Sequence, residues 1–302
     1  MIELIKKANI DFMGKRKIAF VISGALVLLG IMGIWEISRG KANLGIDFAG
    51  GVSLELRFSS PFSLSEIREA LRKGGFPDVE LQDVPYEQRL ILKLKKQKEE
   101  IGLLTEEIIG ALKTNLPEKE FFVESTTEIG PKVSKRLRND ALWAVAMAVV
   151  GILIYITIRF RFRFSLGATI ATFHDVITVV GIFYILGKEF NLVVLSALLI
   201  IAGYSLTDTV VVFDRIRENI KRNIRDSLEV LINRSINEVL SRTIITSLTT
   251  LFAALALYIF GGVAIRDFSL AIIIGVIVGT YSSIFVASPV VLMFGGMESK
   301  RK

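Results

Sequence analysis

The sequence contains no cysteine and a single histidine in 302 residues. The absence of cysteine excludes disulfides and thiolate metal sites, although it does not identify a compartment. One histidine excludes a histidine-rich metal centre. The sequence also lacks a nucleophile motif, a cluster of metal-ligating residues and a phosphate-binding loop. We therefore expect a protein that is not an enzyme and that binds neither a cofactor nor a metal.

The composition is typical of a membrane protein. Hydrophobic residues make up 52% of the chain and the mean hydropathy is +0.55, which is too apolar for an ordinary soluble domain. Charged residues still account for 22%, so a substantial part of the chain lies in water. The net charge of +7 does not indicate nucleic acid, because the basic residues cluster beside hydrophobic segments, as topology signals do. We expect contact with membrane lipid and none with nucleic acid.

Six hydrophobic segments are long enough to span a bilayer, which needs about 20 residues. They cover 18–37, 138–158, 165–187, 190–213, 243–260 and 267–294. A cleaved signal peptide is the alternative for the first segment, because it follows Lys15-Arg16-Lys17. Its apolar run is too long for a signal peptide, and Glu36-Ile37-Ser38 makes a poor cleavage site. We interpret it as an uncleaved anchor.

The short loops differ in positive charge, and this predicts the orientation. Basic residues precede the first span, join the second to the third and the fourth to the fifth, and follow the sixth; they include Lys15, Arg16, Lys17, Arg159, Arg161, Arg163, Arg215, Arg217, Lys221, Arg222, Lys300, Arg301 and Lys302. The opposite short loops hold only Lys188-Glu189 and Arg266-Asp267. The positive-inside rule then places both termini in the cytoplasm and 38–137 outside.

We expect three parts: 1–37 with the first span, an extracytoplasmic domain over 38–137, and a five-helix membrane domain over 138–302. The outer part alternates between strand and helix patterns, with a turn at Pro85-Tyr86-Glu87. The predicted elements are a strand at 52–58, a helix at 63–73, strands at 79–84 and 89–95, a helix at 101–116 and a strand at 121–129. This order predicts a ferredoxin-like α+β domain.

The cytoplasmic segment 214–242 contains an amphipathic helical pattern over 226–241. Asp226 followed by Glu229 resembles a capping box at its start. Two interpretations remain open for this segment. It lies flat in the membrane interface, held by its arginines, or it is a connector helix packed on protein.

Asp208 is the most informative residue, because it lies within an otherwise apolar span. An acid near the centre of a membrane helix costs roughly 2.5–3.5 kcal/mol on insertion scales. Such residues face a bundle interior, pair with another group or carry a proton or ion. No lysine or arginine lies within one helical turn of Asp208. We favour a functional role over a structural one.

Further polar residues accompany Asp208 within the spans. They are Ser205 and Thr209 on the fourth span, Arg242, Thr246 and Ser247 on the fifth, and His174 and Asp175 on the third. Each also has a structural interpretation: serine and threonine bond to a carbonyl one turn back, Arg242 is an interfacial charge, and His174-Asp175 is a structural pair. Gly275, Gly279 and Ser283 form a small-residue ridge that packs on a neighbouring span or on a partner subunit.

The motifs along the whole chain resemble those of the SecF family, accessory subunits of the Sec protein-export machine. The fourth-span signature lies at Gly203–Asn219, and a further motif, Gly45–Gly51, follows the first span. Other matches are Glu128–Pro131 with Val133-Ser134, Phe173–Asp175, Ser241–Ser247 and Gly279–Ser283. One departure is Thr207, where the family commonly has asparagine. It is a small polar exchange.

The resemblance implies a function that the composition alone does not indicate. SecF pairs with SecD, each with six spans in the arrangement of resistance-nodulation-division transporters. Together they use the proton-motive force to help pull a translocating preprotein from the SecYEG channel in the prokaryotic cell membrane, with YajC as a further partner. The family's fourth-span acid and fifth-span arginine, implicated in proton flow, correspond to Asp208 and Arg242.

A physical mechanism is compatible with this implication. A nearby guanidinium and a low-dielectric surrounding act in opposite directions on an acid, so Asp208 can change protonation when helices shift. One charge moved through the membrane potential supplies about 2.3 kcal/mol per 100 mV. Gly45, Gly50 and Gly51 are hinge candidates, because glycine tolerates unusual backbone angles. The alternative for these glycines is a tight turn into the first strand.

Two other classes of function remain open. The first is a half-transporter of the same superfamily that moves lipid or a small solute. The second is a non-conducting membrane scaffold in which Asp208 and Arg242 form only a structural salt bridge. The coupling ion, H⁺ or Na⁺, is not indicated by the sequence.

Overall fold

The structure, a computed structural model, describes residues 9–39, 43–84, 88–95, 101–223 and 225–299. The chain divides into two compact units. The helical unit is built from 1–43, 144–189 and 193–302. The sheet unit is built from 44–143 together with 190–192.

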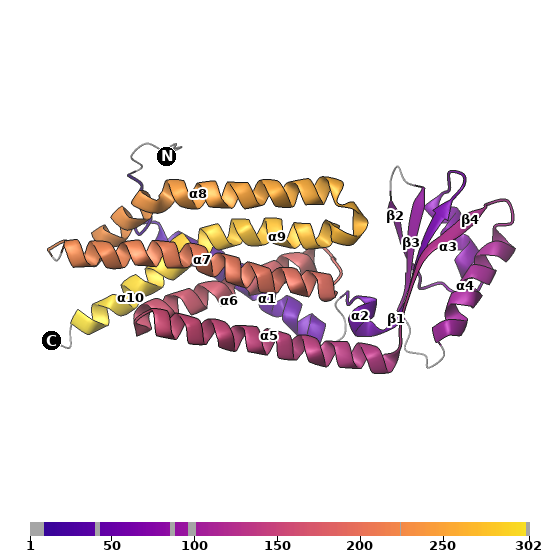
Figure 1. Cartoon of the computed structure of the whole chain (residues 1–302), viewed down its shortest axis with the longest axis horizontal. Helices are drawn as coiled ribbons and strands as arrows, with labels where there is room; N and C mark the ends of the chain where they lie inside the picture. Colours follow the sequence, from indigo (N-terminus) through magenta and orange to yellow (C-terminus); the bar gives the residue numbers. More distant parts are fainter. Residues whose placement is uncertain (1–8, 40–42, 85–87, 96–100, 224, 300–302) are drawn as a thin grey trace. The chain divides into compact units, whose positions relative to one another are not determined.

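Six helices in the described residues are long and apolar enough to cross a membrane, which confirms the predicted number of spans (Figure 1). They are α1 (Arg16–Ser38), α5 (Pro131–Arg159), α6 (Phe162–Ile185), α7 (Leu192–Arg222), α8 (Leu228–Phe260), and a last span of α9 (Gly262–Ser282), the π-helical turn η1 (Ser283–Ala287) and α10 (Ser288–Ser299). Several run well past the predicted apolar segments, because charged residues with high helix propensity continue the helix.

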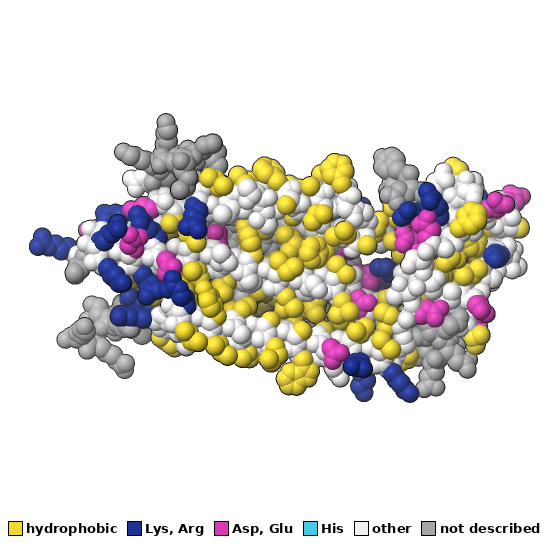
Figure 2. All heavy atoms as spheres, viewed as in Figure 1, with side chains coloured by type: hydrophobic (Ala, Val, Ile, Leu, Met, Phe, Trp, Pro, Cys, Tyr) yellow, Lys and Arg dark blue, Asp and Glu magenta, His cyan; other side chains and the backbone are white. Residues whose placement is uncertain are grey.

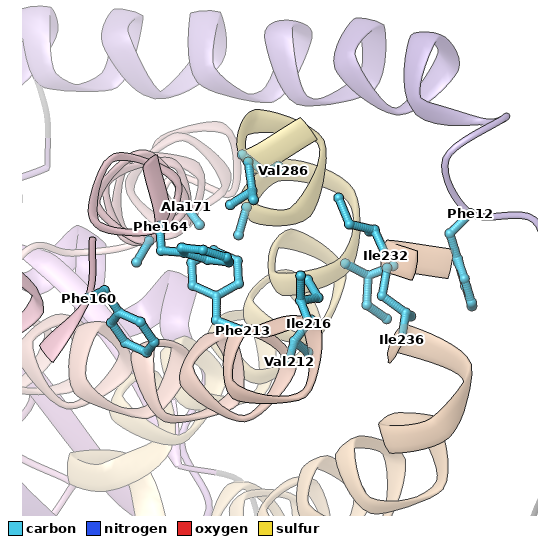
Figure 3. Close-up of a cluster of buried hydrophobic side chains, with 14 of the residues drawn as sticks. Phe12, Phe160, Phe164, Ala171, Val212, Phe213, Ile216, Ile232, Ile236 and Val286 are labelled. Carbon is cyan, nitrogen blue, oxygen red and sulfur yellow. The ribbon is translucent and has the colours of Figure 1, made fainter. Parts of the chain in front are cut away.

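The core of the helical unit lies where α6, α7, the start of α8 and η1 meet (Figure 3). Its densest part is an aromatic group: the Phe213 ring meets the rings of Phe160 and Phe164 edge-on, at centroid distances of 5.9 and 5.2 Å. Such edge contacts add to the free energy gained by burial of the ring surfaces. Ile232 and Ile236 of α8 are fully buried in the same cluster.

That contact decides between the two interpretations of 226–241. The apolar side chains of this segment pack into the core, and the segment is the first part of α8 rather than a separate interfacial helix. The structure thus has the second arrangement, a helix packed on protein. The predicted capping box is wrong, because Ser227 caps the helix by accepting a hydrogen bond from the backbone N–H of Val230. Asp226 instead pairs with Arg234 at 3.0 Å.

Two small-residue contacts bring helices close together. A Cβ at Gly275 would lie 2.5 Å from the side chain of Ile201, and one at Gly279 would lie 3.1 Å from Ser205. The ridge on α9 therefore packs against α7 within the chain, which is the first of the two partners considered for it. Ser283 is fully buried in η1 and donates to the Thr280 carbonyl.

The second contact joins α1 to α6 and was not anticipated from the sequence. A Cβ at Gly30 would lie 2.1 Å from the carbonyl oxygen of Ile177, and one at Gly181 would lie 2.6 Å from the backbone nitrogen of Gly30. The two backbones therefore touch, which only glycine permits at these positions.

The sheet unit has the predicted order of elements: β1 (Gly51–Phe58), α3 (Leu64–Lys73), β2 (Glu80–Val84), β3 (Arg89–Leu94), α4 (Ile101–Asn115) and β4 (Phe121–Ile129). Its four antiparallel strands follow the order β2-β3-β1-β4, so the ferredoxin-like fold is confirmed (Figure 1). Leu54 of β1 lies opposite Leu92 of β3 and Thr126 of β4. The predicted turn at 85–87 lies outside the described residues.

One sheet face and the two helices form the apolar core of this unit. Alternate residues of β1 and β3, including Leu54 and Leu92, are fully buried against Ile67 of α3 and Leu104 and Leu112 of α4. The other face carries ion pairs such as Arg89–Glu55, which are partly exposed and contribute little to stability. A capping box starts α3, in which Ser63 and Glu66 exchange hydrogen bonds.

The Gly50-Gly51 pair forms a tight turn into β1, preceded by the short helix α2 (Ile46–Ala49). Gly50 has φ +80° and Gly51 has φ +141°, a region that side chains other than hydrogen rarely allow. A Cβ at Gly51 would lie 2.1 Å from the Leu94 carbonyl oxygen. This is the geometry of the turn alternative, and a hinge role for Gly45, Gly50 and Gly51 stays a prediction.

Candidate functional site

Asp208 lies on α7 with only 8% of its surface exposed. Its Oδ2 atom is buried and has no hydrogen-bond partner among the described residues. A buried carboxylate oxygen without a partner costs free energy, so its retention indicates a use for it.

Two residues of α8 face this acid. Arg242 lies within electrostatic range of Asp208, and the hydroxyl of Thr243 is directed at the carboxyl group. Neither makes a hydrogen bond to it in this conformation: Thr243 Oγ1 is itself buried without a partner. Over the part of the chain that the structure describes, Asp208 and Arg242 form no direct ion pair. The arrangement brings a donor hydroxyl and a positive charge near an acid without a direct ion pair between Asp208 and Arg242.

Arg215 shares a helix face with Asp208 but is occupied elsewhere. Its guanidinium binds Glu238 and Glu218, each at 2.6 Å. Nearby, Arg159 binds Asp214 at 2.6 Å. Figure 2 shows Lys and Arg side chains in dark blue and Asp and Glu side chains in magenta gathered at one end of the helical unit. Arg242 is therefore the arginine available to Asp208.

A second buried acid, Asp175 of α6, is fully enclosed and joins three helices. Its Oδ2 accepts hydrogen bonds from Ser205 of α7 and, at 2.7 Å, from Ser282 of α9. Its Oδ1 lies 2.9 Å from Nδ1 of His174. His174 is 4% exposed, and its Nε2 atom is buried without a partner. The structure thus brings together His174, Asp175 and Ser205, all of which the sequence singled out.

The remaining predicted polar residues have local roles. Thr209 is buried on α7. Thr246 donates to the carbonyls of Arg242 and Thr243, as membrane-helix threonines commonly do. Ser247 meets Thr280 of α9 at 2.7 Å and so links α8 to α9.

Two residues of these sites were not singled out from the sequence. Ser282 lies inside the Gly279–Ser283 motif; Thr243 belongs to a polar stripe on the fifth span, with Thr246, Ser247 and Thr250 at helical spacing, but was not chosen as a site residue. Their neighbours in those motifs were chosen instead, because a single sequence does not show which hydroxyl of a stripe faces the acid. The only sequence signal for Ser282 and Thr243 was their position inside these motifs.

The π-helical turn η1 begins directly after Ser282. Pro289 has no backbone N–H, so the α-helical hydrogen bond to the carbonyl four residues earlier, at Phe285, is missing. Ser288 donates its hydroxyl to the Ser283 carbonyl at 3.0 Å across the turn. Wide turns of this kind recur beside functional groups in helices, and this one sets the position of Ser282.

The glycine motif after α1 contains a further acid with a defined contact. Within the sheet unit, the Asp47 carboxylate accepts a hydrogen bond from the Leu192 backbone N–H at 3.0 Å. Gly45 donates its N–H to the Phe190 carbonyl at 2.8 Å. An acid is favoured at this place because Leu192 begins α7 and its N–H lacks a partner within the helix. Asp47 was missed as a site residue because only the glycines of its motif were considered.

No group of three or more His, Asp or Glu side chains with metal-binding geometry occurs among the residues that the structure describes.

Comparison with known proteins matches two families to the chain. "Protein export membrane protein SecD/SecF, C-terminal" covers residues 109–297, and "SecD/SecF GG Motif" covers 41–61. The chain is similar to "Protein translocase subunit SecF" of Thermodesulfovibrio yellowstonii, at 60% identity over 98% of both chains. It is 42% identical to the subunit of that name from Calditerrivibrio nitroreducens over 99% of both chains.

Among solved structures, SecDF from Thermus thermophilus, described as a translocon-associated membrane protein, superposes with a TM-score of 0.81 at 37% identity. It is matched over 96% of this chain and 39% of its own. SecDF in a super-membrane-facing form gives a TM-score of 0.71 at 35% identity, over 98% of this chain and 40% of its own. The chain thus spans about two fifths of those proteins but nearly the whole of its curated relatives, and it belongs to the SecF family of protein translocase subunits.

Proposed function

We propose that this chain, together with a SecD subunit, uses the proton-motive force to promote export of preproteins through a SecYEG channel. The observation that carries the proposal is the buried, unpartnered Oδ2 atom of Asp208 in the middle of a membrane-spanning helix. Family membership supplies the translocase context. We place both termini in the cytoplasm and the sheet unit outside, in a prokaryotic cell membrane.

The partner is supported by the solved relatives and by the apolar surface of the chain. SecDF is solved as a single chain of which this sequence matches about two fifths, which leaves room for a SecD-like portion. On α5, Leu142, Met147 and Ile158 are 65%, 66% and 83% exposed. Side chains this apolar are stable only against lipid or another subunit. SecYEG, YajC and the preprotein are proposed partners on the family relation alone.

The proposed cycle uses Asp208 as the proton carrier and Arg242 with Thr243 as its alternating partners. When Asp208 is ionised, a small movement of α8 toward α7 pairs it with the Arg242 guanidinium and the Thr243 hydroxyl. Protonation removes the charge and releases the pair. Each charge moved through the membrane potential contributes about 2.3 kcal/mol per 100 mV, enough to bias helix positions and through them the sheet unit.

The unpaired state of Asp208 favours this cycle over a permanent structural salt bridge. A scaffold role requires the acid and Arg242 to be joined, because a buried charge left alone destabilises the fold by about 3–5 kcal/mol. A half-transporter of lipid or small solute shares the same helices. The two functions differ in what changes the ion flux. A lipid or small solute changes it in a half-transporter, whereas a preprotein changes it in the proposed export subunit.

The test is proton flux in vesicles that hold the complete complex with SecD. Asp208→Asn keeps size and hydrogen bonding but cannot carry a proton, so flux and export should fall at least tenfold while assembly is retained. Asp214→Asn is the matched control: it lies on the same helix, is partly exposed and pairs with Arg159. It should leave flux near wild type. An assembled Asp208→Asn complex with normal flux and export would refute the mechanism.

Arg242→Lys separates charge from geometry. Lysine keeps the positive charge but lacks the planar fork of five donors, so a partial loss of flux is expected. Arg234→Lys, on the same helix and paired with Asp226, is its control. A structural pair would instead lose complex yield in step with flux in both Asp208→Asn and Arg242→Lys.

A further inference from the structure

The Asp175 site has features that the cycle above does not use. Asp175 is 0% exposed and His174 is 4% exposed, and together they contact α7 and α9 through two serines. A carboxyl group enclosed to this degree costs free energy unless every state that it adopts is hydrogen-bonded. The site satisfies this condition in both protonation states.

The neighbours of Asp175 can hydrogen-bond to both the ionised and the neutral form. Toward a carboxylate, Ser205 and Ser282 donate to Oδ2 and the Nδ1–H of His174 donates to Oδ1. Toward a carboxylic acid, the Nδ1 of His174 accepts the acid proton, or a serine hydroxyl rotates and accepts it. Hydroxyl groups are both donors and acceptors, so no helix has to move when the proton arrives.

His174 adds a second place for the same proton. With one proton between them, the pair is either a neutral acid beside a neutral imidazole or a carboxylate beside an imidazolium, and both have a net charge of zero. Loss of the proton leaves a charge of −1. The buried Nε2 atom has no partner in the described residues, so the imidazole is held through Nδ1 alone and keeps one nitrogen uncommitted.

The groups in contact with the Asp175 carboxyl group are the imidazole of His174 and the hydroxyls of Ser205 and Ser282. α7 presents Ser205 beside it, with Tyr204 and Asp208 nearby in sequence. α9 presents Ser282 and Tyr281, and the Tyr281 hydroxyl bonds Ser23 and the Ala19 carbonyl of α1. Apart from Asp208 and the His174–Asp175 pair, the described charged residues of these elements lie toward their ends: Arg16, Lys17, Glu36, Arg163, Asp214, Arg215, Arg217, Glu218, Lys221, Arg222, Arg266 and Asp267.

We propose that Asp175 and His174 form a second proton-binding site, distinct from Asp208 and linked to it through Ser205. Ser205 lies one helical turn before Asp208 on α7. The hydroxyl group that hydrogen-bonds to Asp175 is therefore on the same helix as Asp208. Ser282 likewise stands directly before η1. The proton on Asp175 therefore sets how firmly α7 and α9 are held to α6. This link rests on the proposed proton cycle, whereas the site itself does not.

Infrared difference spectroscopy on the complex with SecD tests the site directly. The carbonyl stretch of a protonated carboxylic acid is separate from that of a carboxylate, so each acid is followed as pH changes. We expect the wild type to show a titrating buried acid whose band disappears in Asp175→Asn and persists in Asp208→Asn. His174→Gln should keep the band and shift its midpoint. An identical titration in wild type and Asp175→Asn overturns the proposal.

Serine variants provide the same test without removing the acid, should Asp175→Asn fail to assemble. Ser205→Ala and Ser282→Ala each remove a hydrogen-bond donor to the ionised form. The midpoint of the titration should therefore rise by about one pH unit. Ser269→Ala is the control, because its buried hydroxyl bonds only the Ile265 carbonyl of its own helix. An unmoved midpoint in both variants rejects the site.

Flux measurements separate this inference from the proposed function. Normal flux in Asp208→Asn rejects the proposed cycle whatever the infrared result. If Asp208→Asn abolishes flux, the proposed cycle stands and the link can be tested in a separate variant. We expect Ser205→Ala alone to change the pH dependence of flux and to leave assembly intact. A pH profile of flux that coincides with that of the Ser269→Ala control would reject the link through Ser205, while the infrared titration still decides the site.

Discussion

Asp11 holds the chain before α1 against the start of α8. Its Oδ1 accepts hydrogen bonds from the Gly14 backbone N–H and from the Asn233 amide, each at 2.9 Å. Asn233 in turn accepts from the backbone N–H groups of Phe12 and Met13. These donors, Gly14 first and Asn233 second, hold the pKa of the Asp11 carboxyl below its usual value of 3.8. Contact between the chain before α1 and the start of α8 therefore favours the ionised form of Asp11.

This contact predicts a pH dependence of docking. Because the folded pKa is lowered, the stabilisation is complete above the pKa of the free side chain and is lost as pH falls through the folded pKa. A spin label on Ile10→Cys should become mobile at acid pH, and the natural lack of cysteine makes this label unique. Asp11→Asn should remove the pH dependence. Glu229→Gln, which opens the Arg16–Glu229 pair, is the control for acid effects elsewhere. The same transition in Asp11→Asn would contradict the assignment.

Individual residues also show how far the sequence predicts the site. Asp208 was identified because one acid in an apolar span is conspicuous by itself. The contacts of Asp175 with Ser205 and Ser282 were not predicted, because these two serines are more than 70 residues apart and meet only in the folded chain. Hydroxyl residues are common in membrane helices, so a single sequence does not distinguish Ser282 from Ser283. Which hydroxyl faces an acid is decided by helix rotation.

At the scale of elements, close helix crossings control the packing of the helical unit. The α1–α6 crossing places the backbones of Gly30 and Gly181 in contact, and the α9 ridge places Gly275 against Ile201. The four-residue spacing on α9 predicted that two helices approach. It did not predict which helix comes close, since that is a property of the bundle. The strands and helices of the sheet unit were predicted nearly to their ends, because alternation and caps are local signals.

The α1–α6 crossing predicts a strong asymmetry among glycines on one helix. Gly30→Ala places a methyl group within 2.1 Å of the Ile177 carbonyl, so the helices must separate, and thermal stability of the complex should fall by about 1–3 kcal/mol. Gly24→Ala is the matched control, because nothing lies within 4 Å of its Cβ. Alanine has the better helix propensity, so this variant should be neutral or slightly more stable. Equal effects of the two substitutions on the melting temperature would show that the crossing is not formed.

At the scale of the whole molecule, two kinds of charge distribution coexist. Counted with the helix ends beside them, the α5–α6 and α7–α8 connections are rich in arginine: Arg159, Arg161 and Arg163 in the first, and Arg215, Arg217, Arg222 and Arg225 in the second. The α6–α7 and α8–α9 connections, counted in the same way, carry Lys188 and Arg266. In the sheet unit positive and negative side chains alternate and pair, as with Arg89 and Glu55. Charge bias in short turns determines orientation, and charge in a folded domain does not.

This difference leads to a prediction about topology. A single cysteine at Asp78, an exposed position between α3 and β2, should react with a membrane-impermeant thiol reagent on intact cells. Asn223→Cys, in the turn between α7 and α8, should react only after lysis, and this neutral exchange leaves the topology signal unchanged. Both variants lack competing thiols, because the chain has no cysteine of its own. Labelling of Asn223→Cys on intact cells, with protection of Asp78→Cys, would invert the orientation. It would also place the arginine-rich connections outside the cytoplasm, against the positive-inside rule.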